Sequence, residues 1–318
     1  MFKEPLQLSI VCICYNQSSY IQKCIETVMD LKCTFELIVC DDASTDGSVQ
    51  IINDLSLKYN FKTILNKTNT GNCILFNKAL KECIGKYVID LAADDYVLPE
   101  ILTERLTALE NSNLKHGFSY SDAHYVNEKG DFLFLHSQLI KNYNPPIGNI
   151  YEKLFDYRFI CPPTVIFVTK VLKEISGYDE NLSYEDFDIW TRLAKNNQVT
   201  YFSQPTIAKR VVTNSSAVKF YGKNSKHLYS TFVICLKNNT YFQNNPLKGF
   251  ENFVFYHFKI SVLTANFEVA ELFLNEFKFI KKKYILYFIL KHLLTYKIDL
   301  SKIYKLYLAF RLKDLKIK

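Results

Sequence analysis

Short apolar runs alternate with helix-like segments through the first 93 residues, and this alternation restricts the fold more than any other feature of the chain. Each run has the length and character of a buried strand. The runs cover Leu8–Cys14, Glu36–Cys40, Phe61–Leu65 and Lys86–Ala93. A strand–helix repeat of this kind predicts an α/β fold, in which helices flank a mostly parallel sheet on both faces.

A dinucleotide-binding fold is the first rival with the same alternation. It requires a Gly-x-Gly-x-x-Gly loop directly after the first strand, where the glycines let the backbone approach a pyrophosphate. Residues 14–17 read Cys-Tyr-Asn-Gln and contain no glycine. The sequence therefore argues against that fold.

Beyond residue 99 the elements are less regular. A turn at residues 177–180 precedes a helix that carries Glu185 and Asp186. The other expected elements are helices over Pro99–Ser112 and Tyr151–Phe155, strands over Gly117–Tyr120, Val165–Val168 and Val199–Phe202, and a hairpin over Tyr125–Phe134. The composition changes after this region, so we expect two domains, residues 1–215 and 216–318.

The overall composition is that of a water-soluble globular protein. Hydrophobic residues make up 48% of the 318 residues and charged residues 22%. The nine cysteines form no Cys-x-x-Cys pair and no Cys/His cluster with zinc-ligand spacing. With no signal-peptide pattern at the start, these features predict a protein of the reducing cytoplasm.

Positive charge is concentrated in the last part of the chain. Residues 278–318 carry twelve Lys or Arg against two Asp, a balance of +10 within a net charge of +7, so the remaining residues sum to −3. A slightly acidic body does not favour nucleic-acid binding. In the tail, Phe, Tyr, Leu, Ile and Lys interleave at helical spacing, as in Tyr284–Leu294 and Ile303–Leu312.

Two interpretations of this tail are compatible. The apolar stretches are too short and too often interrupted by Lys to span a bilayer. A helical region that packs its aromatic faces internally explains the pattern, and so does a basic amphipathic surface that rests on anionic lipid. We therefore expect a helical C-terminal region and a peripheral location on the inner face of the cell membrane.

Two adjacent carboxylates, Asp94 and Asp95, follow the run at Lys86–Ala93, and Pro99 then opens a helix. In open α/β sheets, ligands bind beyond the carboxyl ends of the strands. Acidic residues placed there suit a divalent cation together with phosphate oxygens. Capping of the following helix is the simpler alternative, and the local sequence supports both equally.

Four stretches, in this order, resemble the inverting family-2 glycosyltransferases, which have the GT-A fold. The resemblance covers about residues 5–215, and the second stretch is the most distinctive. The stretches are Ser9–Asn16, Glu36–Gly47, Gly85–Pro99, and Gly177–Glu180 followed by Glu185 and Asp186. The resemblance implies a GT-A core, similar to a Rossmann sheet, with a helical C-terminal region.

The resemblance implies a metal site at the acidic turn. Asp94 aligns with the metal ligand of the family, and Asp95 is the second candidate. Many relatives have another Asp two positions before Asp94, where this chain has Ala92. Mn²⁺ or Mg²⁺ is the implied cofactor, because both suit carboxylate and phosphate oxygens.

The resemblance also places the nucleotide at the ends of the first strands. Asp42, and less strongly Asp41, are candidates to contact the base or ribose, with capping of the next helix as the alternative. Tyr15 and Asn16 follow the first strand and belong to the same predicted site. Relatives often carry Ala-Arg-Asn after the third strand, where this chain has Phe76 and Asn77, so we expect contacts from Asn77 and Lys78.

The pair Glu185–Asp186 resembles the catalytic acidic pair of the family. An acceptor hydroxyl needs a base to take its proton, and we assign that role to Asp186. Asp188 and Arg192, at i and i+4, form either part of the site or a surface ion pair. Trp190 lines the acceptor cleft or lies in the core, Arg210 matches a basic residue of many relatives, and His124 is a weaker acceptor-site candidate.

These observations predict a metal-dependent inverting glycosyltransferase of surface-polysaccharide assembly. The resemblance implies a nucleoside-diphosphate sugar as donor, most often a uridine-diphosphate sugar in this family. The implied acceptor is a glycan or a lipid-linked glycan. Two alternatives stay open. One is a catalytically silent nucleotide- or sugar-binding protein, and the other is a sugar nucleotidyltransferase, although the Gly-rich basic signature of the latter is absent after the first strand.

Overall fold

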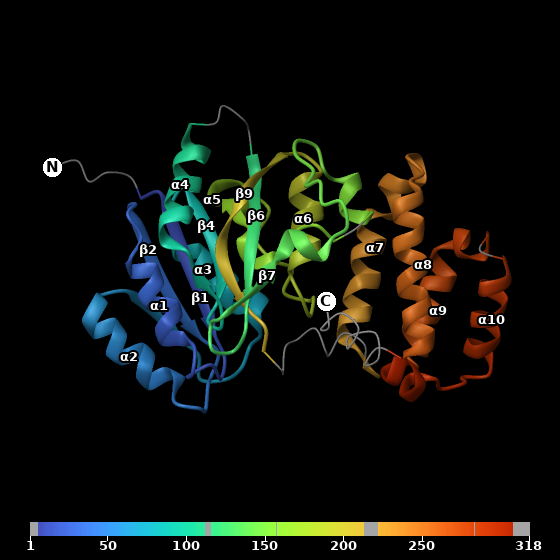
Figure 1. Ribbon diagram of the computed structural model, residues 1–318. Coiled ribbons are helices and arrows are strands. Elements are labelled where there is room, and N and C mark those ends of the chain that lie inside the picture. The colour runs from blue at the N-terminus through green and yellow to red at the C-terminus, as the bar shows by residue number, and fades with distance from the viewer. Residues whose placement is uncertain (1–5, 112–115, 157, 213–221, 283, 308–318) are drawn as a thin grey trace. The chain divides into compact units, whose positions relative to one another are not determined.

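The computed structural model describes residues 6–111, 116–156, 158–212, 222–282 and 284–307. The chain divides into two compact units (Figure 1). The first unit comprises residues 1–181 and 185–212, and the second comprises residues 182–184 and 213–318. The expected boundary between residues 215 and 216 lies outside the described residues.

The first unit is built on one mixed sheet. Its described residues form nine strands in the order β3-β2-β1-β4-β8-β6-β9-β5, with β7 paired to β6. The strands are β1 (Leu8–Cys14), β2 (Phe35–Asp41), β3 (Lys62–Leu65), β4 (Tyr87–Ala92), β5 (Tyr96–Val97), β6 (His116–Val126), β7 (Phe132–Leu135), β8 (Ile166–Val168) and β9 (Gln198–Arg210). Strands β3, β2, β1 and β4 are mutually parallel, and the predicted α/β class is confirmed.

Two strands are longer than the sequence predicted. Strand β6 joins the expected strand at 117–120 and the first arm of the expected hairpin, and β9 continues past residue 202 to Arg210. The two run parallel to each other, with register shifts beside Asp122. Pro205 interrupts the apolar pattern of β9, so its length depends on pairing with β6, which a local pattern does not reveal.

Helices of the first unit pack on this sheet. Ile25 of α1 and Leu102 and Leu106 of α4 share a buried core with Ile10 of β1. The helices are α1 (Ile21–Met29), α2 (Ser48–Tyr59), α3 (Asn72–Glu82), α4 (Pro99–Glu110), α5 (Thr169–Glu174) and α6 (Asp186–Ala194). Short 3₁₀ turns cover His136–Leu139 (η1), Glu152–Phe155 (η2) and Pro162–Thr164 (η3).

One cation lies inside this unit. Arg105 of α4 is 1% exposed and donates hydrogen bonds to Thr164 O (2.7 Å), Ser119 Oγ (3.0 Å) and Thr206 Oγ1 (3.2 Å). Burial lowers the pKa of Arg105 to about 9. Because its partners belong to η3, β6 and β9, this side chain ties three sequence-distant segments together.

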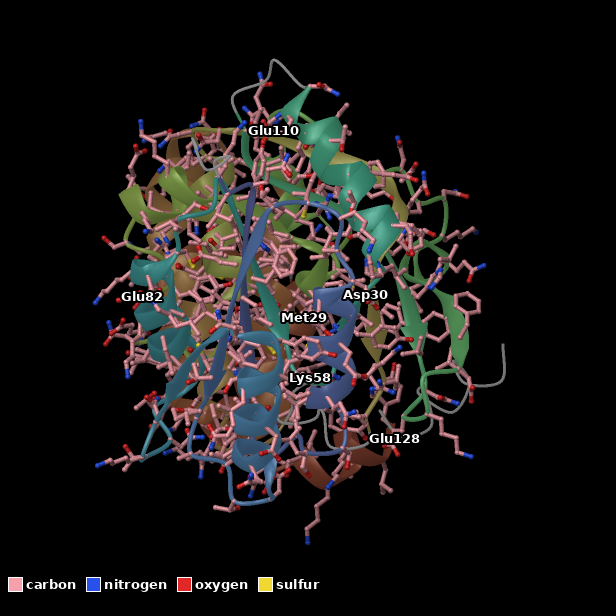
Figure 2. The ribbon with its side chains drawn as sticks, turned by 90° about the vertical axis from the view of Figure 1, so that its left-hand side faces the viewer. Met29, Asp30, Lys58, Glu82, Glu110 and Glu128 are labelled. Atoms are coloured by element: carbon pink, nitrogen blue, oxygen red, sulfur yellow. The ribbon has the colours of Figure 1, made fainter. Side chains whose placement is uncertain are left out.

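Many other charged side chains of the first unit lie at its surface, as Figure 2 shows for Lys58, Glu82 and Glu110. Glu82 pairs with Lys62 at 2.6 Å, and both side chains are half exposed. Exposed pairs of this kind contribute about 0–1 kcal/mol each. The fold of this unit therefore does not depend on its surface charge.

The second unit is helical. Its aromatic core includes Phe232, Phe250, Phe273 and Phe277. Its labelled helices are α7 (Lys226–Asn244), α8 (Lys248–Leu263), α9 (Phe267–Glu276) and α10 (Tyr284–Thr295), with a 3₁₀ turn, η5, at Lys278–Lys282, and residues 301–307 are also helical. None of the described helices has the length and apolar character needed to cross a bilayer.

Candidate active site

The carboxyl ends of β1, β2 and β4 lie side by side at one edge of the sheet. Cys14 pairs with Asp41, and Ile13 pairs with both Cys40 and Ala92. The polar residues that follow these strands are therefore neighbours in space. This is the edge at which open α/β sheets bind ligands.

Asp42 holds the loop that leads from β3 to α3. Its Oδ1 accepts from Thr70 N (2.8 Å) and Asn66 Nδ2 (3.0 Å), and its Oδ2 accepts from Gly71 N (2.8 Å). Burial raises its pKa, but these hydrogen bonds outweigh burial, so the pKa of Asp42 lies below its usual value. The carboxylate is a loop organiser, and its predicted contact with a nucleotide stays a prediction.

Asp41 and Asp46 shape the adjoining turn. Asp41 accepts from Ser44 N (2.8 Å) and Ser44 Oγ (2.6 Å). Asp46 accepts from Ser48 N at the start of α2 (3.1 Å) and from Ser18 N (2.9 Å). The first turn of α2 is therefore served by Asp46, and helix capping does not explain Asp41 or Asp42.

Tyr15 and Asn16 differ in what they offer a ligand. Asn16 has a left-handed backbone (φ 54°), and its Oδ1 accepts from Thr45 N (2.8 Å) while its N–H donates to Ser44 Oγ (2.8 Å). Tyr15 is 50% exposed at the end of β1. Asn16 therefore braces the turn, and the Tyr15 ring presents an open face suited to stacking.

Asn77 joins α3 to the turn that follows α5. It donates to Tyr178 O (2.8 Å) and Glu180 Oε1 (3.0 Å) and accepts from Tyr178 N (2.8 Å). Gly177 has a φ of +66°, and an added Cβ would lie 2.3 Å from Asn77 Oδ1. Both amide hydrogens of Asn77 serve this structural tie, so neither is left for the predicted nucleotide contact.

Lys78, the next residue, is exposed and lies beside the loop between β3 and α3. Its Nζ donates to Asn66 Oδ1 (3.3 Å) in the loop that Asp42 holds. The predicted role of Lys78 at the nucleotide is compatible with this position.

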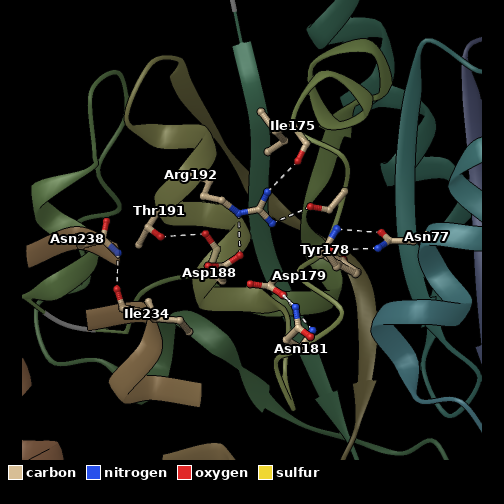
Figure 3. Close-up of polar contacts among 11 residues, drawn as sticks. Asn77, Ile175, Tyr178, Asp179, Asn181, Asp188, Thr191, Arg192, Ile234 and Asn238 are labelled. Atoms are coloured by element: carbon tan, nitrogen blue, oxygen red, sulfur yellow. Dashed lines mark hydrogen bonds and ion pairs between the residues drawn. The ribbon is translucent and has the colours of Figure 1, made fainter. Parts of the chain in front are cut away.

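A buried ion pair fixes the start of α6 (Figure 3). Arg192 Nε donates to Asp188 Oδ2 (2.7 Å), and its two other nitrogens donate to Ile175 O (3.0 Å) and Gly177 O (2.7 Å). Asp188 is 1% exposed. The interpretation of this pair as a surface pair is therefore wrong, and its function is to hold the 175–177 turn against α6.

Three carboxylates meet near the start of α6. Tyr178 Oη donates to Asp90 Oδ2 (3.0 Å). Burial raises the pKa of Asp90 to about 7, with Asp186 adding to the shift. Burial, then Asp186 and Asp90, raise the pKa of Glu185 well above its usual range. Acidic side chains from β4 and from the start of α6 are thus grouped around Asp186, the predicted base.

Sequence reasoning missed Asp90. Its signal was a single charged residue inside the apolar run at 86–93. The side chain lies on β4 and faces the helix that carries the predicted base, which the run alone does not indicate.

Asp94 and Asp95 lie in a second concentration of negative charge. Asp95 is 5% exposed, and its Oδ1 accepts from Arg210 N (2.7 Å). Burial and then Asp94 raise the pKa of Asp95 to about 7, and burial raises the pKa of Asp94. Helix α4 begins after Leu98 without any side-chain cap, so capping does not explain the two carboxylates.

This pair fits a divalent cation that takes most of its ligands from elsewhere. Within the described ranges, no three His, Cys, Asp or Glu side chains are arranged to hold a metal. Mg²⁺ and Mn²⁺ often bind through one or two carboxylates plus substrate phosphates. The pKa values of both carboxylates are raised because burial outweighs the contacts from Lys209 and Arg210. Gln17, which also contacts Asp94, has an Oε1 that is buried and accepts no hydrogen bond from the described residues.

Three predicted acceptor-side residues occupy structural positions. The Arg210 guanidinium donates to Asp94 O (2.9 Å) and Glu128 O (2.6 Å). Trp190 is 8% exposed and belongs to the core. The ring of His124 meets Phe132 edge-on at 4.9 Å, and burial lowers its pKa.

The family model described as "Glycosyl transferase family 2" matches residues 9–176. An uncharacterized glycosyltransferase of Rickettsia conorii is 28% identical over 200 residues, which are 61% of this chain and 31% of the relative. One from Methanocaldococcus jannaschii is 27% identical over 251 residues, 76% of this chain and 83% of the relative. Chondroitin synthase of Escherichia coli is 28% identical over 61% of this chain and 27% of its own length. The chain thus spans less than a third of two of these relatives.

Solved structures show the same fold. TarS residues 1–349 of Staphylococcus aureus, in complex with UDP-GlcNAc, have a TM-score of 0.58 and 16% identity, covering 88% of this chain and 91% of that one. The mannosyltransferase PcManGT of Pyrobaculum calidifontis, with GDP-Man and Mn²⁺, has a TM-score of 0.56 and 14% identity, covering 96% and 88%. The GT-A fold is therefore confirmed.

Proposed function

Because the chain belongs to glycosyl transferase family 2, we propose that it transfers a sugar from a nucleoside-diphosphate sugar to an acceptor hydroxyl, with inversion. The observation that carries the proposal is electrostatic convergence at one edge of the sheet. Asp95, after β4, and Asp186, at the start of α6, both act on the ammonium group of Lys209. Groups suited to a diphosphate and to a nucleophile are therefore close together.

The donor side is assigned to Asp94 and Asp95. These carboxylates would hold Mn²⁺ or Mg²⁺, which, when bound, offsets the charge that develops on the diphosphate leaving group. Tyr15, on the neighbouring strand end, would stack on the base. The UDP-GlcNAc complex of TarS supports a uridine nucleotide, although PcManGT was solved with GDP-Man.

The acceptor side is assigned to Asp186. Its carboxylate takes the proton of the acceptor hydroxyl while the oxygen attacks the anomeric carbon from the face opposite the diphosphate. The Asp188–Arg192 pair and Asn77 fix the segments on either side of this residue. Burial, then Asp186 and Asp90, hold the pKa of Glu185 well above its usual range, and we assign to Glu185 the orientation of Asp186.

The acceptor is proposed to be a glycan, free or lipid-linked, in surface-polysaccharide assembly. Relatives named TarS and chondroitin synthase support this class. Cytoplasmic location at the inner membrane face would bring such an acceptor to the site. In the second unit, α10 exposes Ile285 (79%) and Phe288 (64%) in a basic part of the chain, as a lipid-facing surface requires.

The membrane contact is tested by co-sedimentation with vesicles containing anionic phospholipid. The double variant Ile285→Glu/Phe288→Glu is expected to lose most of its binding. Leu57→Glu is the matched control, because Leu57 of α2 is 86% exposed on the first unit. Equal binding of all three proteins would exclude α10 as the contact.

The activity is tested first by thermal unfolding with the diphosphates of uridine, guanosine, cytidine and thymidine, each with and without Mn²⁺. A ligand at 100 times its Kd adds about 2.7 kcal/mol, or roughly 5–11 °C for a unit of this size. We expect a Mn²⁺-dependent shift with one diphosphate that Asp94→Ala abolishes.

Turnover is then measured as release of that diphosphate from its sugar donors. Binding without release would favour a silent nucleotide-binding protein. The absence of any shift would contradict the nucleotide-metal site itself.

A further inference from the structure

Two neighbouring cations at the end of β9 have different surroundings. Arg210 is 7% exposed, and its guanidinium is used by main-chain carbonyls and by the rings of Tyr20 and Tyr96, at 4.7 and 5.6 Å from their centroids. Lys209 is half-buried, and no hydrogen bond or ion pair joins its ammonium to any residue in the described ranges. Among the described residues, Lys209 is therefore the cation of this pair whose N–H donors have no acceptor, and the resemblance did not single it out.

Strand pairing places Lys209 beside the acidic turn. Tyr96 of β5 pairs with Ala208 in an antiparallel register, so Asp95, one residue earlier, lies level with Lys209. The hydrogen bond from Arg210 N to Asp95 Oδ1 (2.7 Å) fixes this alignment of Asp95 with Lys209. On the neighbouring strand β6, Tyr125 pairs with Lys209, and the centroid of its ring lies 5.8 Å from Lys209 Nζ.

The charged neighbours of Lys209 are carboxylates from both sides of the site. Burial lowers its pKa, but Cys161, Tyr125, Asp95 and Asp186 outweigh burial, so the pKa lies above its usual range. Burial raises the pKa of the Cys161 thiol to about 11 and raises the pKa of Tyr125, so both are neutral at pH 7. The charges that act on the ammonium are therefore those of the acidic turn and of Asp186.

An ammonium group has three N–H donors and accepts nothing. Here no described residue accepts a hydrogen bond from those donors, the ammonium is half-buried, and carboxylates of both the acidic turn and α6 act on it. Phosphate oxygens are suitable acceptors for these N–H donors, because they carry negative charge and lysine binds phosphate as a compact positive charge.

We propose that Lys209 binds a phosphate oxygen of the donor diphosphate and stabilises it as the leaving group. This inference rests on the proposed function. In the step, the bond from the anomeric carbon to the phosphate oxygen breaks and its electron pair stays on that oxygen. The acceptor oxygen bonds to the carbon and its proton passes to Asp186, while Lys209 keeps its own proton and donates a hydrogen bond.

The inference also accounts for the shortened acidic motif. Ala92 occupies the position where many relatives have a further Asp, so one potential anionic ligand is absent. A lysine beside Asp95 supplies positive charge to the diphosphate directly. Binding of a diphosphate should therefore depend on Lys209 even when divalent metal is removed.

The test is calorimetric titration of the full-length chain with inorganic pyrophosphate and with UDP, in EDTA and in Mn²⁺. Pyrophosphate probes the diphosphate subsite without depending on the base. Four proteins are compared: wild type, Lys209→Met, Lys209→Arg and Lys170→Met. Lys170 of α5 is the charge-matched control, because its side chain is 86% exposed.

We expect Lys209→Met to weaken binding of both ligands in EDTA by about tenfold or more, the loss of one charge-assisted hydrogen bond. Lys209→Arg should recover most of the affinity, and Lys170→Met should bind as wild type does. Thermal unfolding of ligand-free Lys209→Met should match wild type, which separates lost binding from lost folding.

Affinities of Lys209→Met within twofold of wild type would overturn the inference, and so would an equal loss in Lys170→Met. A wild-type protein that binds neither ligand, with or without Mn²⁺, would instead refute the proposed function and the inference with it. The two failures are therefore distinguishable from the wild-type titration alone.

Discussion

Two groups of carboxylates lie at the same edge of the sheet and differ in how their charge is met. After β2, each carboxylate accepts several hydrogen bonds from nearby loops, and the pKa of Asp42 and Asp46 is lowered. After β4 and at the start of α6, burial raises the pKa values of Asp90, Asp94, Asp95 and Glu185, and neighbouring carboxylates add to the shift for all but Asp94. Hydrogen bonds outweigh burial in the first group, whereas burial outweighs the compensating contacts in the second.

The difference separates architecture from ligand binding. A carboxylate whose lone pairs are filled by backbone N–H groups fixes the shape of a loop and has little left for a ligand. A buried carboxylate with uncompensated charge is costly to the folded protein unless something else neutralises it. Such groups are concentrated at functional sites. The second group is therefore the candidate chemical centre, and the first organises the loops that follow β2 and β3.

The largest effect is expected for the base. Asp186→Asn removes the proton acceptor but keeps the shape, so turnover should fall about 10²–10⁴-fold, the usual contribution of a general base. Affinity for the nucleoside diphosphate should change little. Steady-state turnover and calorimetric binding measure the two effects. Activity within tenfold of wild type would show that another residue is the base and that the carboxylates at the start of α6 are not the chemical centre.

A stability difference of opposite sign sharpens the contrast. Asp42→Ala leaves the backbone donors of Thr70 and Gly71 without their acceptor, so we expect a loss of about 2–3 kcal/mol, or roughly 4–12 °C in Tm. Asp95→Asn, which relieves repulsion with Asp94, should leave Tm unchanged or higher. Thermal unfolding of the ligand-free proteins in EDTA checks both. A larger loss for Asp95→Asn would reverse the assignment of the two groups.

The raised pKa of Asp90 makes the free energy of unfolding depend on pH. Its folded-state pKa of about 7 lies above the unfolded value, so the folded state binds more protons between pH 4 and 7. Stability contributed by the neutral form is therefore lost as pH rises through this window. Asp90→Asn cannot ionise and still accepts from Tyr178.

We expect Asp90→Asn to exceed wild type by about 1–2 kcal/mol at pH 8, after discounting for partial exposure, and by much less at pH 5. Urea unfolding at both pH values measures this. Asp54→Asn is a suitable control, since Asp54 lies on the exposed face of α2 and pairs only with Gln50 among hydrogen bonds to described residues. A parallel change in both variants would show that net charge, and not Asp90, sets the slope.

Much of the fold could be predicted because its determinants are local. The apolar runs at 8–14 and 36–40 predict strands from their local pattern alone, and Pro99 marks the start of α4. The full length of β9 could not be predicted, because Gln204 and Pro205 break its pattern and pairing with β6 restores it. Local pattern thus specifies an element only where tertiary pairing agrees with it.

The site divides in the same way. Asp94, Asp95 and Asp186 are candidates from the sequence because short motifs mark them, and their roles in the site stay predictions. The structural roles of Asn77 and Arg210 cannot be predicted from the local sequence, because their partners are remote. Tyr178 is 101 residues from Asn77, and Glu128 is 82 residues from Arg210. Lys209 was missed for the complementary reason. Its ammonium has no hydrogen-bond or ion-pair partner among the described residues, which only a three-dimensional arrangement can show.

The smallest effect is expected for Lys78, the cation on the architectural side. Its ammonium is exposed and contacts only the Asn66 amide among hydrogen bonds to described residues. An exposed charge contributes about 0.2–1 kcal/mol and is screened by salt. Lys78→Met should therefore weaken UDP binding up to about fivefold at low ionic strength, and less in 0.5 M NaCl.

The matched comparison is Lys209→Met, whose larger loss should persist in high salt because the carboxylates and the half-buried ammonium are shielded from counterions. Titration of both variants with UDP at two salt concentrations measures the difference. If Lys78→Met lost as much affinity as Lys209→Met and kept that loss in salt, positive charge would act equally on both sides of the edge. The carboxylates after β2 would then belong to the chemical centre as well, since a cation that binds phosphate beside them would place the diphosphate between the two groups.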